Sequence, residues 1–288
     1  MTDRRQRPIE AIGCLMPVDA SGRIVNACSG ERPVGHWGQA VDELIVHAKA
    51  GLRGTLRSVY LRGSVARGLA VDQVSDIDLI CVVSRAPPGL SPQWAIAVGA
   101  DVRRRHPFCT DVGLRVVLLD WLMGSPRAHS MRFLLKTQGL CVSGTDLGSA
   151  WSDYTLADAR IVLDVLPGAI REFRQFLLRS PDINWRGIER RCRWIMKKIV
   201  RAGLELVADR ERAYSRDLQP CWEAFARHYP DQAASMREVL DLAVNPSADR
   251  QRIMAALEVG EWVTANDPGA PVRRESDQAS DRPALTAD

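Results

Sequence analysis

The fold is decided by two short runs separated by a brief loop, Leu61-Arg-Gly-Ser-Val-Ala-Arg-Gly68 and Ser75-Asp-Ile-Asp-Leu-Ile-Cys-Val-Val83. Asp76 and Asp78 stand two apart at the start of an apolar strand pattern, so their side chains point to the same face, with Cβ atoms roughly 6–7 Å apart. Two carboxylates held side by side repel each other unless a cation lies between them. Because Mg²⁺ prefers hard oxygen ligands, the pattern predicts a magnesium site at Asp76 and Asp78.

The first run predicts a site for phosphate beside that metal. Gly63 and Ser64 end a strand pattern over 58–62, and Val65 begins a helical turn. A glycine at this point lets the backbone approach a ligand closely. The free N–H groups of the turn and the Ser64 hydroxyl form an anion site, to which Arg67 adds a guanidinium. A phosphate cradle followed by metal-binding carboxylates predicts a nucleoside triphosphate bound with its metal.

Alternating strand and helix patterns surround these two runs and fill residues 36–150. The spacing of apolar residues predicts strands over 58–62, 77–83, 112–119 and 140–142, and helices over 36–49, 92–105 and 121–136. From residue 151 the patterns are helical, at about 155–178, 184–209, 217–229, 231–243 and 248–262, and Thr155 and Asp158 form a capping-box pattern. We therefore expect an α+β fold, with a mixed-sheet domain over 36–150 and an all-helical domain over 151–264.

The two ends of the chain carry weaker patterns. Residues 1–35 form an N-terminal extension in which a Ser21-Gly22 turn separates two short apolar stretches. This pattern predicts either a hairpin added to the edge of a larger structure or a loosely held arm. Residues 265–288 consist mainly of Asp, Pro, Ala, Ser and Arg, which predicts a disordered tail.

The motif Gly63-Ser-x-Ala-Arg-Gly68 followed by Ser75-Asp-Ile-Asp-Leu79 resembles the signature of the DNA polymerase β superfamily of nucleotidyltransferases. More narrowly, it resembles the small bacterial nucleotidyltransferases that include the aminoglycoside adenylyltransferases. The resemblance implies a nucleotidyltransferase domain over 36–150, two Mg²⁺ ions, and ATP or another nucleoside triphosphate as co-substrate. It also implies a third acidic residue on a neighbouring strand.

Asp111, at the head of the strand pattern over 112–119, occupies the place expected for that third carboxylate. Asp101 and Asp120 are less favoured, because Asp101 falls in a predicted helix and Asp120 at the far end of the strand. In the resembled mechanism Asp76, Asp78 and Asp111 hold the metals, and an acceptor hydroxyl attacks the α-phosphorus. Asp111 is either the general base or only a metal ligand, and the sequence leaves both roles open.

The longest predicted helix carries a basic stripe, formed by Arg190, Arg193, Lys197 and Arg201. Lys197 or Lys198 is expected to reach the triphosphate, as basic side chains of the helical domain do in the resembled family. The stripe is also compatible with a plain solvated face or with a polyanion such as RNA. We expect Trp185, Trp194, Trp222 and Phe225 in the core, and Asp217 as a helix N-cap.

Composition excludes several classes of protein. The chain of 288 residues is 46% hydrophobic with a formal net charge of +4. No apolar run approaches the length of a membrane span, and no apolar segment follows the N-terminus, so we expect neither a membrane protein nor a secretory signal. The seven cysteines are scattered without a C-x-x-C pair, which disfavours a disulfide framework or a zinc ribbon and favours a cytoplasmic protein.

Three functions follow from these patterns. The first is an enzyme that transfers a nucleoside monophosphate, AMP from ATP in the simplest case, onto a hydroxyl of a small molecule such as an antibiotic, releasing pyrophosphate. The second is a toxin- or antitoxin-like nucleotidyltransferase that modifies tRNA or a protein. The third is a catalytically inactive nucleotide-binding regulator. The basic helix weakens the case for a polycationic acceptor, and the sequence indicates no oligomeric state.

Overall fold

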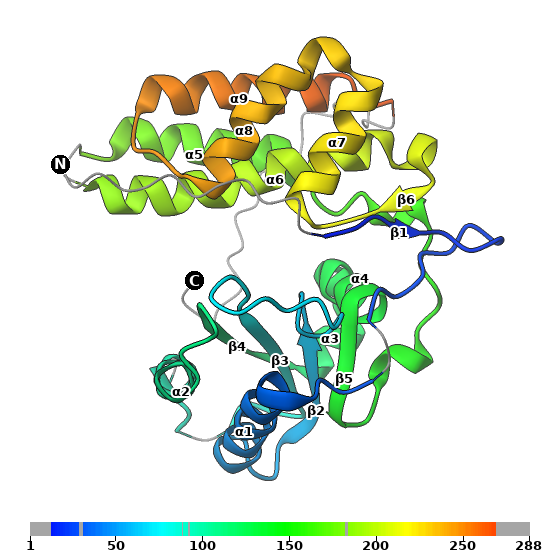
Figure 1. Ribbon diagram of the computed structural model, residues 1–288, viewed down its shortest axis with the longest axis vertical. Helices are drawn as coiled ribbons and strands as arrows, with labels where there is room; N and C mark the ends of the chain where they lie inside the picture. Colours follow the sequence, from blue (N-terminus) through cyan, green and yellow to red (C-terminus); the bar gives the residue numbers. More distant parts are fainter. Residues whose placement is uncertain (1–12, 29–30, 88, 92, 182–183, 269–288) are drawn as a thin grey trace. The chain divides into compact units, whose positions relative to one another are not determined.

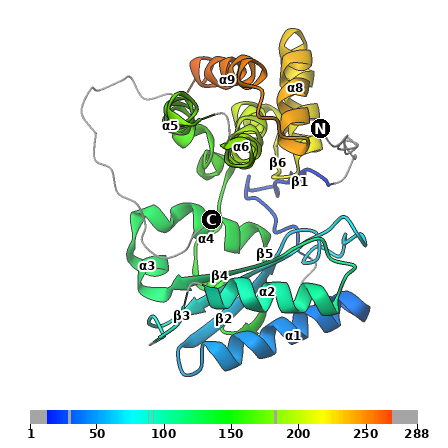
Figure 2. The same ribbon diagram turned by 90° about the vertical axis from the view of Figure 1, so that its left-hand side faces the viewer.

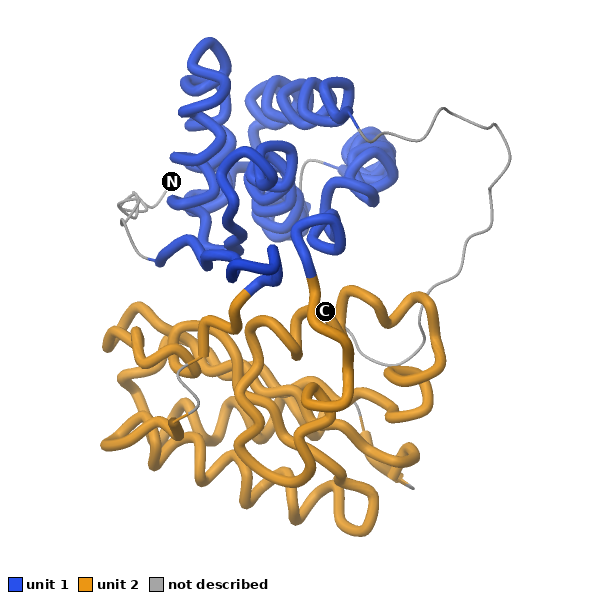
Figure 3. Tube along the Cα trace, turned by 90° about the vertical axis from the view of Figure 1, so that its right-hand side faces the viewer, with its two compact units in different colours: residues 1–24, 155–276 blue, residues 25–154, 277–288 orange. Residues whose placement is uncertain are grey.

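The computed structural model describes residues 13–28, 31–87, 89–91, 93–181 and 184–268, which divide into two compact units (Figure 3). The sheet unit contains the described residues of 25–154, and the helical unit contains 13–24 and 155–268. This division differs from the sequence expectation at the N-terminus, where one extension over 1–35 was expected: residues 13–24 and 25–35 belong to different units. Residues 1–12 of that extension, and 269–288 of the predicted tail, lie outside the described residues.

The sheet unit is built on a four-stranded mixed sheet of order β4-β3-β2-β5 (Figures 1 and 2). Its strands are β2 (Leu56–Arg62), β3 (Ile77–Val83), β4 (Val112–Leu118) and β5 (Gly139–Gly144). The pair β3–β4 is parallel, whereas β2 is antiparallel to both of its neighbours. The helix α2 (Gln93–Arg105) makes the crossover that a parallel pair requires. The four predicted strands are confirmed.

Helices cover both faces of this sheet, which explains why β3 is a continuous apolar run. Leu79 and Cys81 belong to a core shared with α1 (Gly35–Gly51) and α2. Ile80 and Val82 belong to a second core shared with the segment that follows β4. That segment holds α3 (Leu119–Gly124) and α4 (His129–Gln138), separated by a 3₁₀ turn over Pro126–Ala128, so the single helical zone predicted over 121–136 is broken at a proline.

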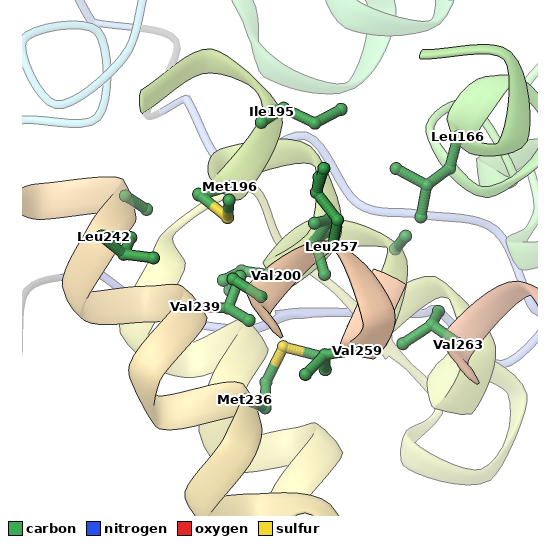
Figure 4. Packing of buried hydrophobic residues seen from close by; sticks show 14 of the residues in the cluster. Leu166, Ile195, Met196, Val200, Met236, Val239, Leu242, Leu257, Val259 and Val263 are labelled. Atoms are coloured by element: carbon green, nitrogen blue, oxygen red, sulfur yellow. The ribbon is translucent and has the colours of Figure 1, made fainter. Parts of the chain in front are cut away.

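The helical unit is built around one long helix. Its helices are α5 (Leu166–Arg179), α6 (Trp185–Glu211), α7 (Leu218–His228), α8 (Ala233–Val244) and α9 (Arg250–Ala265). An apolar stripe of α6, formed by Ile188, Cys192, Ile195, Ile199 and Leu206, is buried, and Ile195, Met196 and Val200 pack among residues of α8 and α9 (Figure 4). The amphipathic pattern alone does not stabilise α6; burial of this stripe by its neighbours does.

The helix predicted over 155–178 is wrong over residues 155–165. The capping box of Thr155 and Asp158 is present, but it opens a 3₁₀ turn over Leu156–Ala159. A second 3₁₀ turn over Leu163–Val165 precedes α5. Helix α5 then begins at Leu166 with a proline in its first turn, a position where the missing N–H costs nothing.

A short sheet in the helical unit was not predicted. Strand β1 (Met16–Pro17) pairs antiparallel with β6 (Ala213–Tyr214), and a bridge between Val18 and Ile24 closes a hairpin around Gly22. The hairpin expected near the N-terminus is thereby confirmed. The partner strand β6 lies in the connection between α6 and α7. This pairing was not predicted because strands about 200 residues apart leave no local pattern in the sequence.

The predicted tail begins later than expected. Ala265 ends α9, and the carboxylate of Asp267 forms an ion pair with Arg160. The disorder predicted from residue 265 is therefore wrong for the first residues of that segment, because Ala265 is helical and a partly buried ion pair holds Asp267. All seven cysteines are free thiols. Among the described residues no helix is both long and apolar enough to cross a membrane.

Candidate active site

The two predicted metal ligands lie at the first residues of β3. Asp76 directly precedes the strand and is exposed, whereas Asp78 is the second residue of the strand and is half-buried. Because side chains alternate along a strand, Asp78 shares the sheet face of Ile80 and Val82. Asp78 therefore stands at the edge of an apolar surface that anchors its backbone, while its carboxylate remains within reach of solvent.

Two residues for which the sequence predicted no role lie next to the Asp78 carboxylate. Arg62, the last residue of β2, pairs with Asp78 across the sheet, and its Nη2 donates to Asp78 Oδ2 at 2.8 Å. Gly113 pairs with Asp78 on the other side, and a Cβ at Gly113 would stand 2.6 Å from Asp78 Oδ1. The carboxylate thus reaches one neighbouring strand with each oxygen. The adjacency of Arg62 to Gly63 was visible in the sequence, but the register of β4 was not.

Asp111 takes the matching position before β4. Its carbonyl accepts a hydrogen bond from Ile77 N–H at 3.0 Å, so Asp76 and Asp111 directly precede two paired strands. Its Oδ1, however, accepts from the Val112 N–H at 2.9 Å. Within the described ranges no three His, Cys, Asp or Glu side chains are grouped closely enough to hold a metal. The hydrogen bond from the Val112 amide occupies one carboxylate oxygen of Asp111, and the role of Asp111 stays a prediction.

The two less favoured carboxylates lie elsewhere. Asp101 is on α2, where it forms ion pairs with Arg104 and Arg105 that lower the pKa of its carboxyl, first through the hydrogen bond from Arg104. Asp120 is in the first turn of α3, after the far end of β4. Neither is at the edge of the sheet where Asp76, Asp78 and Asp111 lie.

The segment from Gly63 to Gly68 forms a single closed turn. Gly63 has φ of +81° and Gly68 has φ of +70°, values that favour glycine. Arg67 N–H and Leu69 N–H both donate to Ser64 O, at 3.2 and 2.9 Å. The predicted helical turn therefore exists, but Gly68 ends it before a helix can form.

This turn brings hydrogen-bonding groups next to the residues of the acidic pair. Its backbone hydrogen bonds begin at the Arg67 N–H, and the two residues before it, Val65 and Ala66, are buried in the core of the sheet unit. Ser64 Oγ donates to Ser75 Oγ at 2.9 Å, which ties the turn to the residue before Asp76. Arg67 Nε approaches Gly63 O at 3.4 Å, so its side chain lies along the turn. Backbone amides, hydroxyl and guanidinium thus lie close in the chain and in space to the acidic pair.

The acidic residues fit a divalent cation. Carboxylate oxygens are hard donors, and Asp78 already holds a positive charge, that of Arg62, against one of its oxygens. Asp76 adds a second carboxylate that solvent reaches. Asp76 and Asp78 would be the residues that hold the metal, and Asp111 a further candidate.

The two predicted lysines lie in the helical unit, on α6, whereas the carboxylates and the turn lie in the sheet unit. Lys198 Nζ lies 4.6 Å from the ring centroid of Trp194, and burial lowers the pKa of Lys198. Lys198 and Trp194 line a hollow of about 480 Å³ with residues of α5, including Glu172. The reach of Lys197 or Lys198 to a triphosphate stays a prediction.

Two of the four aromatic residues expected in the core are exposed. Trp194 is 50% exposed and Trp185 is 39% exposed, because both fall outside the apolar stripe of α6. Phe225 is buried and Trp222 packs against the core, as expected. Asp217 holds the N-cap position of α7 but makes no cap hydrogen bond; its Oδ2 accepts from Cys14 N–H at 3.1 Å instead.

Comparison with solved structures finds a protein of similar fold. The structure is similar to that of the spectinomycin adenyltransferase AAD(9) from Enterococcus faecialis, solved with ATP and spectinomycin. The two share 13% sequence identity and a TM-score of 0.51, over 79% of this chain and 98% of the other. This chain has the fold of a nucleotidyltransferase. No family model matches the sequence, and no curated protein matches it.

Asp76 and Asp78 lie within the part of the structure that forms the predicted fold. The mixed sheet that carries Asp76 and Asp78, followed by a helical region, is the α+β arrangement expected from the sequence. The comparison extends to the fold of the chain.

Proposed function

We propose that this protein is a magnesium-dependent nucleotidyltransferase that moves a nucleoside monophosphate, AMP from ATP in the simplest case, onto a hydroxyl of a small molecule. One observation carries the proposal. The Asp76–Asp78 pair at the start of β3 lies beside the closed turn Gly63–Gly68, in a nucleotidyltransferase fold. A carboxylate pair next to a phosphate cradle is the arrangement that a metal–triphosphate complex requires.

The residues of the sheet unit take the following roles. Asp76 and Asp78 hold the metal, and the amides of Val65 and Ala66 with Arg67 bind phosphate oxygens. A bound Mg²⁺ pair would stabilise negative charge on the α-phosphate and on departing pyrophosphate.

In the transfer, the acceptor oxygen forms a bond to the α-phosphorus while the bond from that phosphorus to the bridging oxygen breaks. The acceptor's proton passes to a base, for which Asp111 is the candidate. Lys197 or Lys198 is the candidate for binding the triphosphate from the helical unit, because both are cations on α6.

The proposed acceptor is a small, hydroxyl-bearing antibiotic. Its support is the similar fold of the Enterococcus faecialis enzyme, which was solved with spectinomycin. An antibiotic-resistance role follows from that acceptor and is part of the proposal.

A macromolecular acceptor, tRNA or a protein side chain, is the second candidate. It is favoured by the first half of α6, where arginines at 186, 190, 191 and 193 are exposed beside Trp185 and Trp194. Basic side chains interleaved with exposed aromatics are typical of surfaces that bind nucleic acid. A nucleotide-binding module without transferase activity is the third candidate.

A label-transfer assay tests these functions together. Each of the four nucleotides labelled at the α-phosphate is incubated with Mg²⁺, the protein and a pool of aminoglycosides, spectinomycin and total tRNA, and the products are separated by size. Label in a small-molecule product that disappears with Asp78→Asn would support the proposal. Label in tRNA or in protein would move the function to the second candidate. Tight binding of Mg·ATP without any transfer would favour the third.

A further inference from the structure

Arg62 connects the two halves of the candidate site. It directly precedes Gly63 in the chain, and the register of β2 and β3 places it opposite Asp78. Paired residues of antiparallel strands share one face of the sheet, and Arg62 Nη2 lies 2.8 Å from Asp78 Oδ2. The two side chains are 30% and 32% exposed, so the ion pair is partly shielded but open to exchange with solvent ions.

The geometry of Asp78 decides which of its oxygens a metal can take. Oδ1 lies against the backbone of Gly113, where even a Cβ would stand at 2.6 Å. Oδ2 is the oxygen that Arg62 contacts. A divalent ion that binds Asp78 through Oδ2 competes with the guanidinium for the same lone pairs, because both need the negative charge of one oxygen.

We propose that Arg62 is an exchangeable counter-ion: it occupies Asp78 while no metal is bound, and on displacement it binds phosphate oxygens at the turn Gly63–Gly68. This inference rests on the proposed function. Arg62 directly precedes the turn and lies opposite Asp78, so its long side chain starts next to both halves of the candidate site. Its planar fork suits two oxygens of one phosphate.

The exchange predicts two effects of opposite sign. Without Arg62, the metal has no competitor at Asp78, so the metal alone binds more tightly. Without Arg62, the triphosphate loses one cation, so nucleotide binds more weakly when metal is present. A residue that only oriented Asp78 would instead weaken metal binding when removed, and a purely structural ion pair would change neither affinity.

The test is a Mn²⁺ titration followed by electron paramagnetic resonance, on the full-length protein and the variant Arg62→Gln, without nucleotide and then with α,β-methylene-ATP. The matched control is Arg57→Gln, the same charge change at the exposed other end of β2, roughly 16 Å away along the strand. For Arg62→Gln we expect Mn²⁺ to bind roughly three- to tenfold more tightly alone, and the analogue to bind more weakly by a similar factor. Arg57→Gln should resemble the wild type in both titrations.

The two titrations distinguish failure of the Arg62 exchange from failure of the proposed function. If Mn²⁺ binds the wild type in a manner that depends on Asp78, but Arg62→Gln binds it with equal or lower affinity, the exchange is wrong and the proposed function stands. Tighter Mn²⁺ binding with unchanged analogue binding would overturn the phosphate-binding half. If neither protein binds Mn²⁺ or the analogue, the proposed function fails and the exchange fails with it. A thermal unfolding curve for Arg62→Gln shows that the folded protein is being titrated.

Discussion

The sheet unit and the helical unit differ in how far apart in the sequence their functional residues lie. In the sheet unit, the turn, the serine bridge and both carboxylates come from residues 63–78, within one β-strand connection. In the helical unit, the exposed aromatics and the hollow beside Lys198 arise where α5 packs against α6. The proposed metal and phosphate site is therefore encoded mainly by one short segment, whereas the hollow of the helical unit depends on packing between two helices.

The largest expected effect concerns the carboxylate pair of the sheet unit. Replacing Asp78 by Asn keeps the shape of the side chain but removes a negative charge that the metal needs. We expect transfer activity to fall by about 10³-fold or more, with little change in the midpoint of thermal unfolding. The control is Asp101→Asn on α2, the same chemical change at a carboxylate outside the site. Unfolding of Asp78→Asn would show a structural role for this carboxylate, and full activity would show that the transfer does not need its charge.

A substitution at Gly113 gives a second test of the metal site in the sheet unit, with a smaller expected effect. In Gly113→Ala the new Cβ would stand 2.6 Å from Asp78 Oδ1, so the carboxylate must move. We expect affinity for Mn²⁺ to fall roughly 10- to 100-fold, as when the partner of a metal ligand is disturbed. Gly124→Ala is the control, because a Cβ there meets nothing within 4 Å. Unchanged Mn²⁺ affinity in Gly113→Ala would mean that the metal does not use Asp78 in this orientation.

The third test concerns the packing of the helical unit. Glu205 of α6 is buried and accepts hydrogen bonds from the amides of Val162 and Leu163, yet burial raises its pKa from 4.5 to about 8. The folded state therefore binds a proton more tightly than the unfolded chain does. This contribution to stability is fully present below about pH 4.5 and is lost as the pH rises toward 8.

Urea unfolding followed by circular dichroism at several pH values between 5 and 8 measures that loss. We expect the free energy of unfolding to fall by on the order of a few kcal/mol across this range in the wild type. The slope should be largely absent in Glu205→Gln. Glu258→Gln, at an exposed position of α9, should keep the wild-type slope. A wild-type slope in Glu205→Gln would assign the pH dependence to other groups.

The smallest expected effect concerns the N-terminal strand. Ser215 Oγ donates to Cys14 O at 2.8 Å beside the β1–β6 pair. In Ser215→Ala we expect a loss of about 1 kcal/mol in stability and faster hydrogen exchange at β1. Unchanged exchange would mean that the β1–β6 backbone pairing and the Asp217 contact are enough to hold this segment.

The sequence predicted the elements whose determinants are local. The apolar run Ile77–Val83 predicted β3 to the residue, and the position of glycines predicted the turn. The register that places Arg62 and Gly113 around Asp78 was not predictable, because it depends on pairing with two other strands. Trp194 was misplaced because an aromatic residue in an amphipathic helix was expected to be buried. The Cys14–Asp217 contact joins residues about 200 apart, so Asp217 looked like a simple cap.

The central claim is that Asp76 and Asp78 jointly hold the metal of a nucleoside triphosphate. The most direct test is anomalous diffraction from crystals grown with Mn²⁺ and α,β-methylene-ATP. We predict a manganese peak within ligand distance of both carboxylates, with the phosphates at the turn Gly63–Gly68 and Arg62 no longer bound to Asp78. Manganese or phosphates at any other site, with the Arg62–Asp78 ion pair intact, would contradict the account.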